Sequence, residues 1–158
     1  MIGKEEFSKY DWQPLSERCP TESDFGIGLD ERNAWREFGG LSLDQAYKHF
    51  LENPLSYQED FMFMGETAFL YYFPVIERYL YSVRAEDEFD DCQAWILSVV
   101  IAHQIEYGSQ ANDERLIDRI ALLTDHVLSH VSQYATTSDE QERIESSWAS
   151  LKQILSTR

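Results

Sequence analysis

The sequence is poor in cysteine, glycine and proline, and each shortage removes a class of protein. It holds 2 Cys, 7 Gly and 4 Pro among 158 residues. Cys19 and Cys92 match no metal or redox spacing, so a reduced pair of thiols in a cytosolic protein is the expected state. The low glycine and proline content excludes collagen-like and low-complexity chains. The longest uncharged apolar run, residues 94–102, has nine residues, and a bilayer requires roughly 20.

Basic side chains are also scarce. The chain carries 13 Lys and Arg against 29 Asp and Glu, which gives a formal net charge of −16. Nucleic acids bind proteins through clustered cations that displace counterions, so they are excluded as partners. Anionic membrane surfaces are excluded for the same reason. Residues 1–10 lack the apolar core of a secretory signal, and we expect a cytoplasmic protein.

Apolar residues recur at helical spacing along most of the chain, and no segment alternates long enough to predict a strand. The pattern predicts an all-α single-domain bundle with mostly antiparallel neighbours. A capping box at Ser42 and Gln45 marks one helix start, and Ser138 with Gln141 marks another. Five or six helices are expected, over residues 30–38, 43–52, 66–83, 87–107, 112–134 and 138–155. Residues 1–29 are expected to form an irregular arm packed on the helical domain of residues 30–158.

The helix expected after residue 65 carries two different stripes. Pro74 lies inside it and is expected to kink or break it, because proline removes one backbone hydrogen bond. One stripe is expected to be buried, and contains Phe69, Tyr72, Ile76 and Tyr79. The other mixes acids with large apolar groups and is expected to be accessible, with Glu66, Leu70, Glu77 and Tyr81.

Many of the acids have a structural explanation. Carboxylates at a helix start meet the positive end of the helix dipole, and three helix starts account for nine of them. Setting these nine aside still leaves seven more acids than bases. A basic partner explains that excess, because a field of one sign speeds encounter and selects partners. The residues predicted to bind this partner are Glu66, Leu70, Glu77, Tyr81, Glu86, Asp87, Glu88, Asp90 and Asp91.

The four histidines form no pattern that predicts a catalytic or metal-binding site. His126 and His130 are four residues apart, a spacing that suits a shared metal, but a solvated pair is the simpler expectation. His103 is expected to be a hydrogen-bonded core residue. The sequence has no Gly-x-Ser-x-Gly elbow, and we predict no catalytic residue, metal or cofactor. A helical-bundle metal enzyme remains an alternative, and would need His103, Glu106, His126 and His130 to converge with acids of residues 59–77.

The size, the acidity and the segment QEDFMFMGETAFLYYFPVIERYL, residues 58–80, together resemble one class of proteins. These are the small acidic helical immunity proteins of bacterial toxin systems. The resemblance implies one-to-one binding to a cognate toxin, often a basic nuclease, whose active site is blocked. It carries over no individual residue.

The sequence therefore predicts a non-enzymatic acidic binding protein, an immunity or antitoxin-like inhibitor that occludes a basic toxin. The aromatic content leaves a further alternative open. Aromatic rings on helix faces that are not needed for the core are suited to interfaces. A self-associating scaffold, or a homodimer, would also use them.

Overall fold

The computed structural model describes residues 13–85, 94–108 and 113–158. Every regular element in these ranges is helical, which confirms the prediction of an all-α protein. The elements are α2 (Glu22–Phe25), α3 (Leu29–Phe38), α4 (Leu43–Glu52), α5 (Pro54–Tyr57), the 3-10 helix η1 (Gln58–Phe63), α6 (Glu66–Ser82), α7 (Ala94–Tyr107), α8 (Glu114–Ser129), α9 (Val131–Tyr134) and α10 (Ser138–Ser156).

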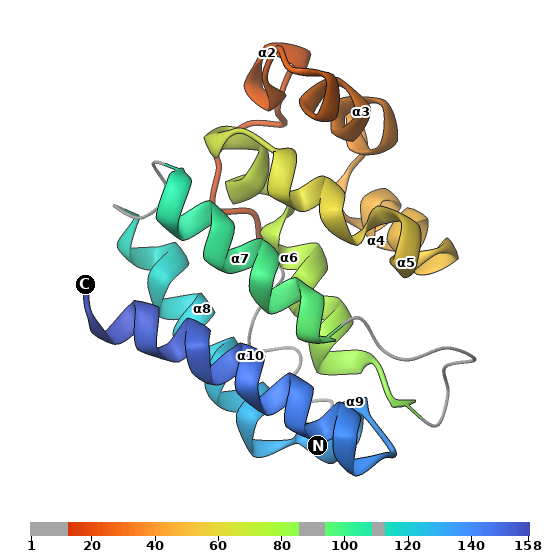
Figure 1. Cartoon of the computed structure of the whole chain (residues 1–158). Helices are drawn as coiled ribbons and strands as arrows, with labels where there is room; N and C mark the ends of the chain where they lie inside the picture. The colour runs from red at the N-terminus through yellow and green to blue at the C-terminus, as the bar shows by residue number, and fades with distance from the viewer. Residues whose placement is uncertain (1–12, 86–93, 109–112) are drawn as a thin grey trace.

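The helices form one compact unit around a continuous apolar core. Helix α10 packs on α7 and α8, while α6 contacts α2, α4 and α8. The 3-10 helix η1 contacts α3 and α7, so it joins the early helices to the late ones. Figure 1 shows α2 and α3 gathered at one end of the molecule, and α10 running beside α7 toward the other end. Within the described residues, none of the helices is both long and apolar enough to cross a membrane.

The helix starts test the capping signals directly. Ser42 accepts the backbone N–H of Gln45 at 3.2 Å, and Gln45 accepts that of Ser42 at 2.9 Å. This capping box is confirmed. The second one is wrong by one residue, because Thr137 rather than Ser138 caps α10, accepting the backbone N–H of Glu140 at 3.3 Å. The motif Thr-x-x-Glu is as good a cap as Ser-x-x-Gln, and the earlier of the two overlapping signals is used.

The helix predicted over residues 112–134 is divided. Asp113 caps α8 by accepting the backbone N–H of Leu116 at 3.1 Å. His130 leaves the helical conformation, with φ −133° and ψ 37°, and α9 follows it. The helix predicted over residues 87–107 is present from Ala94, and its first part lies outside the described residues.

Pro74 does not break α6, which runs without interruption from Glu66 to Ser82. Because proline has no N–H, the carbonyl of Leu70 four residues earlier lacks its helical donor. The backbone N–H of Leu15 supplies that donor from outside the helix, at 3.0 Å. The proline therefore creates the acceptor that fixes the N-terminal arm to α6.

Two arginines of α8 hold the same arm. Arg115 donates to the carbonyl of Leu15 at 2.9 Å, and Arg119 donates to that of Gln13 at 3.0 Å. Leu15 is itself buried. Within its described part, the arm is irregular except for the short helix α2, and its backbone is held at Gln13 and Leu15 by hydrogen bonds to α6 and α8.

Candidate functional site

The predicted division of α6 into a buried and an accessible stripe is half right. The buried stripe is confirmed, since Phe69, Tyr72, Ile76 and Tyr79 are at most 1% exposed. The other stripe was predicted to be accessible, and that is wrong for three of its four residues. Glu66 is exposed, whereas Leu70, Glu77 and Tyr81 are buried.

Glu77 is buried because it has a cationic partner that the sequence pattern of α6 does not reveal. Its carboxylate accepts two hydrogen bonds from Arg119 of α8, one from Nη2 and one from Nε at 3.0 Å. The same guanidinium reaches the carbonyl of Gln13. Glu77 therefore joins α6, α8 and the N-terminal arm, and it is removed from the candidate binding surface.

Tyr81 and Leu70 are enclosed by the helices around α6. The Tyr81 ring lies 4.5 Å from the ring of His126 on α8. Leu70 belongs to the continuous apolar core. Neither side chain presents a surface to a partner. The acids predicted at the start of the next helix, Glu86, Asp87, Glu88, Asp90 and Asp91, lie outside the described residues.

The histidines lie in two separate places. His126 was predicted to be solvated, but it is buried, and its ring stacks on that of His130 at 4.3 Å. Burial, with a smaller effect of the neighbouring His130, lowers the pKa of His126 to about 4. His103, predicted to be a core residue, is only half-buried and lies against Tyr107 with ring centroids 5.0 Å apart. In the parts of the chain that the structure describes, no three His, Cys, Asp or Glu side chains are grouped to hold a metal.

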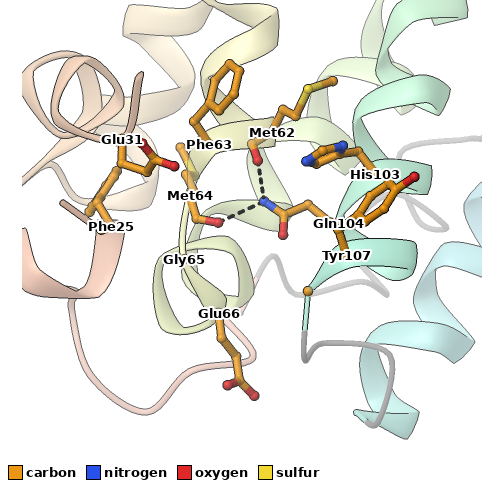
Figure 2. A pocket seen from close by; sticks show the side chains of 12 residues that line it. Phe25, Glu31, Met62, Phe63, Met64, Gly65, Glu66, His103, Gln104 and Tyr107 are labelled. Carbon is orange, nitrogen blue, oxygen red and sulfur yellow. Dashed lines mark hydrogen bonds between the residues drawn. The ribbon is translucent and has the colours of Figure 1, made fainter. Parts of the chain in front are cut away.

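A cavity of about 370 Å³ lies where three distant parts of the chain meet. Its walls come from the α2–α3 region, from the segment joining η1 to α6, and from the last turn of α7. Figure 2 shows the Glu31 carboxylate pointing from α3 toward Phe63 and Met64, and the His103 imidazole reaching the same segment from α7. The volume falls in the range of small-molecule and side-chain pockets.

Gln104 holds the middle wall of this cavity in place. Its side-chain amide donates to three backbone carbonyls, those of Phe61 at 2.7 Å, Met64 at 2.9 Å and Met62 at 3.2 Å. Figure 2 shows two of these bonds, to Met62 and Met64. Gln104 is 3% exposed, and buried carbonyls require such partners. The wall is therefore fixed by a side chain of α7.

Two glycines allow the walls to approach closely. Gly26 has φ 131°, a conformation that favours glycine, and a Cβ there would lie 2.8 Å from Cγ of Glu31. A Cβ on Gly65 would collide with the backbone carbonyl of Asp24. The first glycine makes room for the Glu31 side chain, and the second lets α2 lie directly on the start of α6.

The cavity is acidic and partly aromatic. Glu31 and Glu66 contribute carboxylates, and no lysine or arginine is among the described residues that line it. In that described part of the chain, Glu31 has no hydrogen-bond or ion-pair partner. Tyr107 at its edge is 77% exposed. Beside Gly26, Ile27 in the loop between α2 and α3 is 88% exposed, and Leu29 at the start of α3 is 81% exposed.

A second polar group is found around η1. Asp60 is 6% exposed and accepts one long hydrogen bond, 3.5 Å from the side-chain amide of Asn33. Burial, reinforced by the charge of Glu37, raises the pKa of Asp60 to about 6. Glu37 is itself 3.0 Å from His49. Perturbed carboxyls of this kind occur in catalytic sites and in structural networks alike.

The sequence pattern missed most of the cavity residues. In the sequence, Gly26 and Gly28 are followed neither by a third glycine nor by a helix-opening apolar segment, so they do not predict a phosphate-binding loop. The one signal that could have indicated the cavity is that Glu31 follows two glycines, which have no side chains and so leave room for its carboxylate. Gln104 gave no signal, because its three acceptors lie about 40 residues earlier in the chain.

Among the predicted partner-binding residues, only Glu66 lies at this cavity within the described parts of the chain. In Figure 2 its side chain extends away from Glu31, His103 and Gln104, so its charge contributes to the edge rather than the centre. Comparisons of the chain with models of protein families, with curated proteins and with solved structures gave no match.

Proposed function

We propose that the protein is a non-enzymatic acidic binding protein of the cytoplasm that binds a basic protein partner, as an immunity or antitoxin-like inhibitor does. Its carboxylates would pair with the lysines and arginines that hold the partner's anionic substrate, and aromatic residues would anchor the contact. The partner's active site would be occluded. Neither a metal nor a catalytic group of this chain is needed for that mechanism.

The observation that carries the proposal is an excess of exposed carboxylates that form no ion pair with a lysine or arginine among the described residues. Within the described residues, the ion pairs engage Asp24, Asp44, Glu77, Asp113 and Asp125 with Lys or Arg. Many exposed acids have no such pairing there, among them Glu17, Glu22, Asp30, Glu59, Glu106, Glu114, Asp118, Asp139, Glu142 and Glu145. Self-repulsion on this scale opposes folding, and a basic partner would relieve it.

The structure supports the proposal in a second way, through the position of the cavity. The exposed Tyr107 and the half-buried Met62 and Phe63 line the same cavity as the carboxylates of Glu31 and Glu66. Specific protein interfaces likewise combine aromatic and apolar side chains with polar ones.

The test is capture of the partner from the native host, followed by kinetics on the purified pair. We expect a basic protein bound one to one, encoded beside this gene, whose activity the complex suppresses. Its association rate should fall steeply between about 0.01 and 0.15 M salt, because the screening length shortens from about 30 to 8 Å. A partner that is not basic, or an association rate indifferent to salt, would contradict the proposal. Stoichiometric metal in the purified protein would instead favour the metal-enzyme alternative, and a dimer without a partner would favour the scaffold.

A further inference from the structure

The cavity has three kinds of surface that an arginine side chain can use. It has the unpartnered carboxylate of Glu31, the half-buried imidazole of His103 packed against the Tyr107 ring, and an apolar wall at Met62 and Phe63. From these we infer that the cavity is the binding site for one arginine side chain of the basic partner. The inference rests on the proposed function and names the chemistry at its centre.

The negative charge of the cavity determines that its ligand is a cation. Glu31 points into the cavity, Glu66 stands at its edge, and the described lining residues include no lysine or arginine. An anion would be repelled from such a space, whereas a cation gains from the Glu31 carboxylate. The protein as a whole carries −16 charges, so a cation is also drawn toward this surface from a distance.

Shape and chemistry favour arginine over lysine. A guanidinium is planar, forms paired hydrogen bonds with a carboxylate and stacks on rings, and it is less strongly hydrated than an ammonium. The cavity offers the carboxylate of Glu31 as the partner for the paired hydrogen bonds, while Figure 2 shows His103 and Tyr107 on the other side of the Met62–Met64 segment. The methylene groups of an arginine would lie along Met62 and Phe63, since long basic side chains bury their aliphatic part.

The walls of the cavity are held before any ligand arrives. Gln104 fixes the Phe61–Met64 backbone with three hydrogen bonds. The Glu31 side chain lies against the backbone of Gly26 and Gly28. A pre-formed site loses less conformational entropy on binding. Among the residues that line the cavity, Phe63 and Tyr107 would help to exclude water around the bound guanidinium, as apolar contacts do around interface hot spots.

The test uses the folded protein and a small probe of defined charge. ¹⁵N-labelled protein is titrated with N-acetyl-arginine methylamide, and with the N-acetyl-citrulline and N-acetyl-lysine methylamides as neutral and ammonium controls. We expect saturable shifts at the Gly65 amide and the Gln104 side chain with a Kd of the order of 1 mM, typical of a single anchored group. The citrulline compound should bind at least about tenfold more weakly. Signals of Ser132 and Gln133, at a second cavity lined by Arg84, should not move.

Two matched variants identify the carboxylate. Glu31→Gln keeps the shape and removes the charge, and should weaken arginine binding about tenfold. Asp30→Asn removes the same charge from the neighbouring exposed residue and should change it less than twofold. Circular dichroism confirms that both variants are folded. Shifts that never saturate, equal shifts with citrulline or lysine, or equal loss in both variants would overturn the inference.

The partner complex separates this inference from the proposed function. If a basic partner is bound and Glu31→Gln weakens it no more than Asp30→Asn does, the inference fails while the proposed function stands. If the arginine compound saturates the cavity but no basic partner is captured, the proposed function fails instead.

Discussion

The two halves of the molecule are packed from different residues. Residues 13–85 contain fourteen aromatic side chains, whereas residues 94–158 contain four. In the first, aromatic half, for example, the centroid of the Phe38 ring lies about 5–6 Å from the ring centroids of Phe61, Tyr57 and Tyr72. In the second, aliphatic half, the buried positions of α7 and α8 are chiefly leucine, isoleucine and valine.

The difference shows where irregular features arise. The aliphatic half uses long helices whose small branched side chains fit together at regular spacing. The aromatic half packs large rigid rings from α6 and from several helices of ten residues or fewer. Both halves enclose polar groups, such as Asp60 in the first and Gln104 in the second. The cavity opens at the boundary, with walls from both halves. Functional candidates therefore collect where regular packing ends.

The ionic contact between the halves gives the largest expected effect. Glu77→Lys places a second cation beside Arg119, in a site where Glu77 is 1% exposed. Breaking a buried pair costs about 3–5 kcal/mol, and the like charge adds to that. Chemical denaturation should show this loss. Asp118→Lys, an exposed change beside Arg119, should stay within about 0.5 kcal/mol, and equal effects of the two would contradict a role for the buried pair.

Core truncations then test whether the halves unfold together. Phe69→Ala in the aromatic half should lower the free energy of unfolding by about 3–5 kcal/mol, and Leu123→Ala in the aliphatic half by about 2–5 kcal/mol. Both residues are 0% exposed. Because the core is continuous, each variant should shift one common transition seen by tyrosine fluorescence and by circular dichroism. Two separate transitions in either variant would mean that the halves are independent units.

Asp60 in the aromatic half and His126 in the aliphatic half should respond to pH in opposite directions. The pKa of Asp60 is raised to about 6, above about 3.9 in an unfolded chain, so its contribution to stability is complete at low pH and is lost as pH rises through 6. Asp60→Asn should therefore be more stable than the parent near pH 7, by an amount of the order of 2 kcal/mol. Urea titrations at several pH values measure this. If the difference in stability between the variant and the parent is the same at pH 4 and at pH 7, Asp60 does not titrate in this range.

His126 in the aliphatic half has the reverse sign. Its pKa is lowered to about 4, below about 6.5 in an unfolded chain, so its contribution is complete above 6.5 and is lost as pH falls through 4. His126→Phe keeps a ring against Tyr81 and cannot be protonated. The free energy of unfolding of the variant minus that of the parent should be about 2 kcal/mol larger at pH 5 than at pH 7. Loss of stability on acidification that is identical in parent and variant would exclude His126 as the cause.

The smallest effect concerns the arm. Pro74→Ala restores an N–H that can donate to the Leu70 carbonyl, which Leu15 now occupies. One hydrogen bond is worth about 0.5–1.5 kcal/mol, so exchange of the Leu15 amide should become about two- to tenfold faster. The amide of Ile144 in α10 serves as the internal control and should be unchanged. Equal protection of Leu15 in both proteins would mean that the proline does not govern the docking.

Much of the fold could be predicted from the sequence, because helix signals are local. Ser42 with Gln45 and the stripe through Phe69 and Tyr72 depend on residues within one or two turns. The burial of Glu77 could not be predicted, because its partner is 42 residues away and a lone acid on a helix is normally solvated. The cavity could not be predicted either, since its walls are distant in the chain and are joined only by packing.

The contacts of the N-terminal arm have a consequence for the order of folding. Arg115 reaches the Leu15 carbonyl across 100 residues and Arg119 reaches Gln13 across 106. Closing such long loops is entropically costly and requires α6 and α8 to be in place already. The arm should therefore join after the rate-limiting step, so that weakening its contacts accelerates unfolding and leaves the refolding rate unchanged. The first described residues of the chain would then be among the last to reach their native positions.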